Sequence, residues 1–179
     1  MAFTACWGIG TWHRAFAFVG NTNTTTVFVA KFGWDKDEAI LYNTIITSAA
    51  IVGLVIGSFL SGFLLKIGRR KAAIIGHTCA ILGSAIAMLG NTAALTIGRF
   101  LIGIAGGVSN VVFGKMVTET IPLRVLSRYA MAHQASTATG LACSNALAYI
   151  LPDPKDYEAN KEDEYWRVIY CAPAMVGVL

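Results

Sequence analysis

The sequence is poor in charged residues, and this scarcity excludes an ordinary soluble domain. Only 13% of its 179 residues are Asp, Glu, Lys or Arg, whereas a soluble domain carries about a quarter. Three stretches have no charged residue at all, namely Asn43–Leu65 (23 residues), Ala72–Gly98 (27) and Tyr129–Pro152 (24). Each is longer than the roughly 20 apolar residues that cross a hydrocarbon core as a helix. The sequence therefore predicts an all-α, multi-pass protein embedded in a lipid bilayer.

The sequence also lacks the short motifs of common catalytic and cofactor sites. It contains no Walker lysine loop, HExxH, CxxC or GxSxG. Its four cysteines stand singly in apolar segments, with no spacing typical of a metal site or a disulfide framework. The net charge of +4 belongs to a membrane-embedded chain and has to be interpreted by side of the membrane, so it does not indicate nucleic-acid binding. We expect no enzymatic activity, no cofactor, no metal and no nucleic-acid partner.

Six hydrophobic segments are expected to form a single transmembrane domain over residues 1–179. Their approximate ranges are 2–30, 43–65, 72–90, 95–117, 129–151 and 165–179. The last range has only about 15 residues, fewer than a full span requires. We expect this sixth helix to be short, oblique or completed by a neighbour.

The loop charges predict which side of the membrane each loop occupies. Lys66, Arg69, Arg70 and Lys71 lie between the second and third segments, and Arg124 and Arg128 lie between the fourth and fifth. The alternate loops are more acidic: residues 153–164 contain two cations and six anions, which we interpret as a solvated loop. The positive-inside rule places the basic loops and the amino terminus inside. The membrane is then the plasma membrane or the mitochondrial inner membrane.

Small residues recur at steps of four along two segments, which places them on one stripe of a helix. The second segment carries Ala49, Gly53, Gly57 and Ser61, and the fifth carries Ala132, Ser136, Gly140, Ser144 and Ala148. The fourth segment has Gly103, Gly107 and Gly114 along one face. Small side chains let another helix approach closely. Each stripe therefore predicts a tightly packed partner helix.

The stretch from Gly98 to Gly140 resembles the fourth-to-fifth helix region of sugar porters in the major facilitator superfamily. The residues in register with that family's pattern are Gly98, Arg99, Gly103, Gly107, Glu119, Pro122, Gln134 and Gly140. Gly68-Arg69-Arg70, with Lys66 before it, resembles the end of the family's loop motif between helices two and three. Ser61 and Leu65 depart from that motif, because the family has glycine and an acidic or amide residue there.

The resemblance implies the fold and the candidate functional residues. It implies half of a twelve-helix bundle, with substrate held between two six-helix halves. It assigns the fifth-helix residue Gln134 to contacts with sugar hydroxyls, and we expect Asn21, Asn43 and Thr47 to face the same path. It also implies an inner charge cluster formed by Glu119 and the loop arginines Arg69 and Arg70. The i,i+4 spacing of Lys115 and Glu119 leaves a local ion pair between these two residues open as well.

Two cations stand inside or at the edge of apolar segments. Arg14 interrupts the first segment about halfway along, where a charge is expensive unless paired or wetted. Arg99 stands at the outer end of the fourth segment, and we expect its side chain to snorkel to the membrane surface.

Two functions remain open from the sequence. In the first, the chain carries hexose-type solutes by alternating access, paired with a second half. In the second, it is a degenerate porter half that serves as a structural or accessory subunit of a larger membrane complex. Both require a partner, either a second copy or another membrane protein, and we expect that partner to cover the second and fifth helices.

Overall fold

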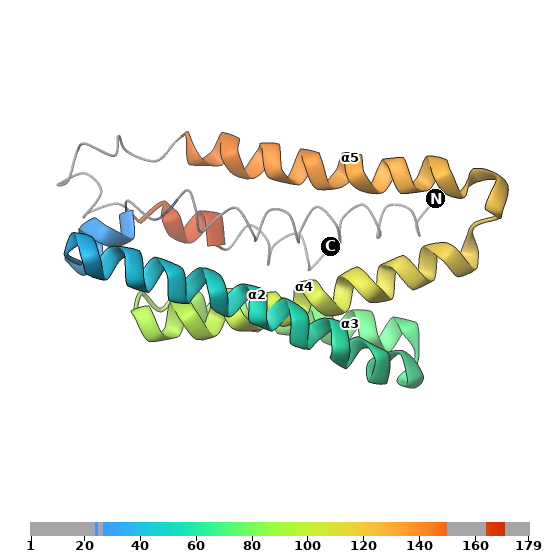
Figure 1. The fold of residues 1–179 in the computed structure, drawn as a ribbon, viewed down its shortest axis with the longest axis horizontal. Coiled ribbons are helices and arrows are strands. Elements are labelled where there is room, and N and C mark those ends of the chain that lie inside the picture. Colours follow the sequence, from blue (N-terminus) through green and yellow to red (C-terminus); the bar gives the residue numbers. More distant parts are fainter. Residues whose placement is uncertain (1–23, 25–26, 150–163, 171–179) are drawn as a thin grey trace.

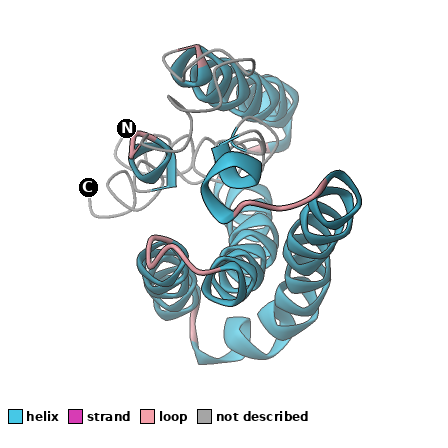
Figure 2. Cartoon of the chain, turned by 90° about the vertical axis from the view of Figure 1, so that its left-hand side faces the viewer, coloured by secondary structure: helices cyan, strands magenta, loops and turns pink. Residues whose placement is uncertain are grey.

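The computed structural model describes residue 24 and residues 27–149 and 164–170, and this part of the chain is a bundle of helices (Figure 1). The four long helices are α2 (Lys36–Ile67), α3 (Arg69–Ala87), α4 (Thr92–Thr120) and α5 (Leu123–Ala148). Short helical stretches cover residues 27–32 and 166–170. The end-on view shows the helices gathered side by side (Figure 2). The expected first and sixth segments lie largely outside the described residues.

The helices α2 to α5 overlap the four central hydrophobic segments, and local chemistry explains where they begin and end. Asp35 precedes α2, and its backbone N–H donates to the Glu38 carboxylate at 3.4 Å, as in a capping box. Asn91 caps α4 by accepting a hydrogen bond from the Ala93 N–H. Gly68 lies between α2 and α3 with φ 118°, a conformation that side chains with a Cβ rarely adopt. This glycine lets the chain reverse between two helices within one residue.

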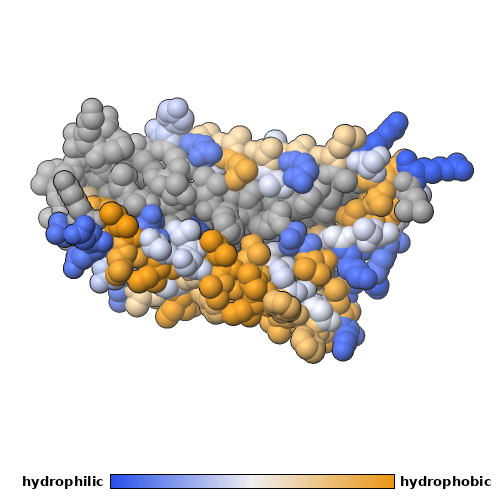
Figure 3. Space-filling view, in the orientation of Figure 1, coloured by the Kyte–Doolittle hydropathy of each residue, from blue (hydrophilic) through white to orange (hydrophobic). Residues whose placement is uncertain are grey.

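The surface of the described residues is unusually apolar along the length of the helices. Two helical segments, Asp37–Ile67 in α2 and Thr92–Thr120 in α4, are long and apolar enough to cross a membrane by length and composition. Large apolar side chains on α2, including Phe59 and Phe63, are exposed. Figure 3 shows apolar surface along the middle of the visible face and hydrophilic side chains towards its ends. This distribution suits a surface that faces lipid rather than water.

The helix α4 is the centre of the described bundle, because α2 and α3 both pack along it. It crosses α2 at a contact made by glycines from both helices (Figure 1). A Cβ on Gly53 or Gly57 would meet the backbone carbonyl of Phe100 or Ile104, respectively. In return, a Cβ on Gly103 or Gly107 would meet the carbonyl of Ala50 or Leu54. The two backbones therefore touch directly, and no residue larger than glycine fits at these four positions without a shift.

The small-residue stripe of α2 is thus filled from within the chain. Gly53, Gly57 and Ser61 are buried, and the Ser61 hydroxyl donates to the Ser58 carbonyl of its own helix. We expected a partner protein to cover this stripe, but α4 of the same chain already covers it. Gly114 also departs from the expected α4 stripe, because it is exposed and has nothing within 4 Å of an added Cβ. Of the three stripe glycines of α4, only Gly103 and Gly107 therefore lie against the α2 backbone.

The contact between α3 and α4 also depends on small residues. A Cβ on Gly83 would lie 2.8 Å from the Gly98 carbonyl oxygen, and one on Gly98 would lie 2.7 Å from the Ala87 nitrogen. Gly98 therefore lets the α3 backbone approach α4 closely, as Gly103 and Gly107 let α2 approach on a different face of α4. Small residues therefore let α2 and α3 each approach the α4 backbone closely, beside the apolar side chains that also pack between these three helices.

The helix α5 stands apart from this three-helix group. Among the described helices it contacts only α4, to which it is joined through Ile121 and Pro122. Gly140 and Ser144 on its stripe are nevertheless buried. The backbone of Ser136 belongs to α5, but its side chain lies outside the described residues.

Candidate functional site

An ion pair joins the α2–α3 turn to the last turn of α4. The Nε atom of Arg69 lies 2.6 Å from the Oε2 atom of Glu119. Gly68 makes this contact possible, because the sharp reversal starts α3 at Arg69, beside the end of α4. Of the two pairings that the sequence left open for Glu119, the direct contact is with the loop arginine. This end of the bundle, which carries the connections α2–α3 and α4–α5, is called the basic end below.

The ion pair forms one wall of a shallow pocket of about 210 Å³. The residues that line this basic pocket are Leu65, Lys66, Arg69, Lys115 and Glu119. They come from the end of α2, the start of α3 and the end of α4. Three cations therefore surround a single carboxylate, and the pocket carries a surplus of two positive charges.

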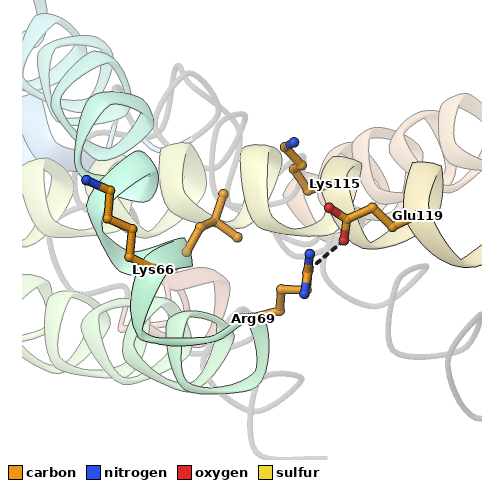
Figure 4. A pocket seen from close by; sticks show the side chains of 5 residues that line it. Lys66, Arg69, Lys115 and Glu119 are labelled. Atoms are coloured by element: carbon orange, nitrogen blue, oxygen red, sulfur yellow. Dashed lines mark ion pairs between the residues drawn. The ribbon is translucent and has the colours of Figure 1, made fainter.

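The side chains of the basic pocket differ in how they are held (Figure 4). Arg69 and Glu119 point toward each other, and the Lys115 side chain stands on the Glu119 side of the pocket. The Lys66 ammonium is directed away from Glu119 and lies 5.5 Å from the centre of the Phe63 ring. Arg70 is exposed and does not line the pocket. The loop motif is thus divided between one paired arginine, one aromatic-bound lysine and one exposed arginine.

The residues expected to contact sugar are placed on two helices that do not touch. Asn43 is half-buried and Thr47 exposed, one turn apart on α2, while Gln134 is exposed on α5. There is no contact between α2 and α5 among the described helices. Asn21 lies outside the described residues. The described structure therefore does not bring these candidates into direct contact.

The opposite end of the bundle holds an aromatic and charged cluster that the sequence analysis did not identify. The Lys31 ammonium donates to Glu164 at 2.6 Å, and Arg167 lies 2.8 Å from the other carboxylate oxygen. Both cations lie 5.6 Å from the centre of the Trp166 ring. The hydrogen bond from Lys31 holds the pKa of the Glu164 carboxyl below its usual range. The sequence feature that could have indicated this cluster is the adjacent pair Trp166-Arg167, which follows an acidic loop.

This aromatic end joins segments that are far apart in the chain. Its buried residues include Val27, Phe28, Ile46, Ala87, Leu95, Trp166 and Tyr170. The rings of Phe28 and Trp166 meet edge to face with centroids 5.3 Å apart. Residues near position 30 and near position 166 are thereby fixed to each other and to the ends of α3 and α4.

The expectation that Arg99 snorkels to the membrane surface is wrong. Its side chain is only 2% exposed, and its guanidinium lies 5.3 Å from the centre of the Tyr170 ring. The reason is tertiary: Tyr170 belongs to the aromatic end, which closes over the start of α4. A cation stacked on an aromatic face in a desolvated site gains more than an exposed one does.

The described residues contain no group of three or more His, Cys, Asp or Glu side chains able to hold a metal ion. Besides the aromatic end, two features of the described part stand out chemically: the basic pocket, and the polar side chains on α2 and α5. The first is suited to electrostatic contact with an anion or an acidic side chain. The second is suited to hydrogen bonding with a neutral polar solute.

A family model described as "Sugar (and other) transporter" matches residues 6–179, nearly the whole chain. The similar proteins are also transporters by name. Hexose transporter 1 of Toxoplasma gondii is 29% identical over 178 residues, which covers 88% of this chain and 31% of that protein. Hexose transporter 1 of Plasmodium vivax (strain Brazil I) is 24% identical over 170 residues, covering 88% of this chain and 34% of that protein.

A shorter alignment relates the chain to a human protein. The solute carrier family 2, facilitated glucose transporter member 4 of Homo sapiens is 31% identical over 101 residues, or 54% of this chain and 20% of that protein. The chain thus spans about a third of the length of the hexose transporters that it matches over most of its own length.

Proposed function

This chain belongs to the sugar (and other) transporter family, and we propose that it forms one six-helix half of a hexose transporter. As a member of that family it is an all-helical integral membrane protein of the major facilitator type, and not an enzyme. The match to a hexose transporter over 88% of the chain carries the proposal that the solute is a hexose. The relatives are all named as transporters, and none supports the alternative of a non-transporting accessory subunit.

In this proposal, transport proceeds by alternating access around a site between two halves. A second copy of the chain or a separate polypeptide supplies the other half. The polar side chains of Asn43, Thr47 and Gln134 face the path of the sugar, together with Asn21. The basic end, with both arginine-containing connections, lies on the inner side of the membrane with the amino terminus, in keeping with the positive-inside rule.

The decisive experiment combines the mass of the native species with an uptake assay. The protein is purified from its native membrane in mild detergent, its mass is measured by light scattering, and it is reconstituted into liposomes with radiolabelled glucose outside. We expect a species containing two six-helix halves and saturable uptake that unlabelled glucose inhibits. Recovery in a larger complex without uptake would contradict the proposal and would favour the accessory role.

The first functional prediction concerns Gln134 on α5. Replacing Gln134 with alanine is expected to raise the KM for glucose about tenfold, because one hydrogen bond to a sugar hydroxyl is lost. The matched control is Thr139→Ala on the same helix, since the Thr139 hydroxyl donates to the Ala135 carbonyl of α5 itself. Uptake kinetics in proteoliposomes measure both variants. An unchanged KM for Gln134→Ala in an active preparation would remove this residue from the sugar path.

The second functional prediction concerns the Arg69–Glu119 ion pair. Arg69→Gln is expected to lower the maximal uptake rate roughly two- to fivefold while leaving the KM unchanged, because the pair connects the α2–α3 turn to the helix that leads into α5. Arg70→Gln removes the same charge from the neighbouring exposed residue. An equal decrease of the maximal uptake rate in both variants would show that the rate depends on the total charge at this end and does not depend on the ion pair.

A further inference from the structure

The basic pocket carries more positive charge than the described residues neutralise. Its lining contains Lys66, Arg69 and Lys115 but only one carboxylate, that of Glu119. Glu119 is engaged by Arg69 at 2.6 Å. Among the described residues, no other carboxylate lies within ion-pairing distance of Lys66 or Lys115. The pocket is therefore an electropositive hollow, and each of its cations is held by a different helix or helix end.

The geometry of the pocket suits an anion with several acceptor oxygens. Arg69 contacts Glu119 through Nε, and a guanidinium carries further N–H donors on its two terminal nitrogens. Lys115 presents its ammonium from α4, beside this pair (Figure 4). Lys66 rests near Phe63 in this structure, but its four-carbon stem allows the ammonium to swing toward an arriving charge.

We propose that the basic pocket binds a phosphate group, held by Lys115, the terminal nitrogens of Arg69 and, after it swings, Lys66. A phosphate offers the charge and the several oxygens that three donors at the corners of one hollow require. The phosphate comes from the headgroup of an anionic phospholipid or from a soluble phosphate compound, since the pocket lies at the end of the membrane helices and is open to both. This binding is independent of the proposed transport of sugar.

Leu65 contributes to this preference for an anion. It is the one apolar residue among the five that line the pocket. A carboxylate at this position would reduce the surplus of two positive charges to one and would repel an incoming phosphate. Leu65 is half-buried and packs against a cluster of the buried residues Ala72, Val108 and Val112.

The test measures phosphate binding directly, without an uptake assay. The full chain is placed in lipid nanodiscs made of phosphatidylcholine with or without 20 mol% phosphatidylglycerol of the same acyl chains, and bound phosphatidylglycerol is counted by native mass spectrometry. A parallel arm titrates inorganic pyrophosphate into the phosphatidylcholine nanodiscs by calorimetry. We expect Lys66→Gln/Lys115→Gln to weaken binding by about tenfold or more, because each cation near a charged surface strengthens attraction severalfold.

The matched control is Arg124→Gln/Arg128→Gln. It removes the same two charges from exposed residues of the same end that do not line the pocket. We expect this control to bind within about twofold of the unmodified chain, because a specific pocket depends on geometry. Equal weakening in the two variants would overturn the proposal in favour of general surface charge. Absence of binding by the unmodified chain to both probes would also overturn it.

The two arms identify the source of the phosphate. Binding of phosphatidylglycerol without binding of pyrophosphate assigns the pocket to a lipid headgroup, and the reverse assigns it to a soluble compound. A second pair of variants tests the pocket without removing any cation. Leu65→Asp is expected to weaken binding, whereas Leu65→Asn, which has nearly the same shape but no charge, is expected to bind clearly better than the aspartate. Equal binding by these two variants would contradict the proposal.

Discussion

Replacing Gly57 and Gly107 together with alanine is expected to lower the free energy of unfolding by at least ~2 kcal/mol and to reduce the yield of folded protein. Each new methyl group would meet a backbone carbonyl across the α2–α4 crossing, that of Ile104 or that of Leu54. Overpacking a tight contact typically costs about 1–3 kcal/mol per site, and a helix backbone cannot rotate away as a flexible side chain does. Thermal unfolding in detergent micelles, followed by tryptophan fluorescence, measures the effect.

The chain offers a matched control on the same two helices. Gly62→Ala and Gly114→Ala make the same chemical change, once on α2 and once on α4, where an added Cβ has nothing within 4 Å. This double variant is expected to be at least as stable as the unmodified protein, because alanine favours a helix over glycine by up to ~1 kcal/mol. A similar loss of stability in both double variants would show that the backbone contact at the crossing is not the cause.

Trp166→Ala is the single substitution expected to have the largest effect outside the glycine crossing. The Trp166 side chain is fully buried and forms the middle of the aromatic end, between Phe28 and Tyr170. Truncating a buried tryptophan typically costs about 3–5 kcal/mol. The loss also removes the ring on which Lys31 and Arg167 rest. We expect a large decrease in the thermal midpoint and release of the contact between residues 27–34 and 164–170.

Val168→Ala provides the comparison for this prediction. Val168 belongs to the same short helical stretch but is 47% exposed, so truncating it leaves no cavity. Its thermal midpoint is expected to stay close to that of the unmodified protein. Limited proteolysis supplies a second measurement, because release of the aromatic end in Trp166→Ala should expose the chain near Glu164 to cleavage. If Trp166→Ala and Val168→Ala unfold at the same temperature, the aromatic end does not support the fold.

The contacts of the α2 glycines exclude them from the surface that a partner protein would cover. Their spacing is typical of a surface that packs against another helix, and from the sequence we expected that helix to belong to a second copy or another membrane protein. The structure uses Gly53 and Gly57 within the chain, against α4. A second half of the transporter would therefore contact other residues of α2 than these two glycines.

Much of the candidate site was accessible from the sequence, but its pairing was not. The resemblance to sugar porters implied one charge cluster of Arg69, Arg70 and Glu119, and the sequence left a local pair of Glu119 with Lys115 open. Which arginine contacts Glu119 depends on how α3 lies against α4. The reversal at Gly68 and the close contact of Gly83 with Gly98 position α3 there. The two adjacent arginines therefore differ: Arg69 pairs with Glu119 and lines the pocket, and Arg70 does not line it.

The sequence by itself determined the fold class and the family, and its four central hydrophobic segments overlap the helices α2 to α5. In a bilayer, the backbone N–H and C=O groups of a long uncharged run must find hydrogen-bond partners within the protein, and a helix provides them from the run itself. That requirement is local to each run. Tertiary structure alone decided that α4 is the central helix, that Arg99 is buried on Tyr170, and that Lys31 meets Glu164. These contacts join residues up to 133 positions apart. No local pattern specifies them, because they depend on how the helices cross, and the crossings are set by where glycine lets two backbones touch.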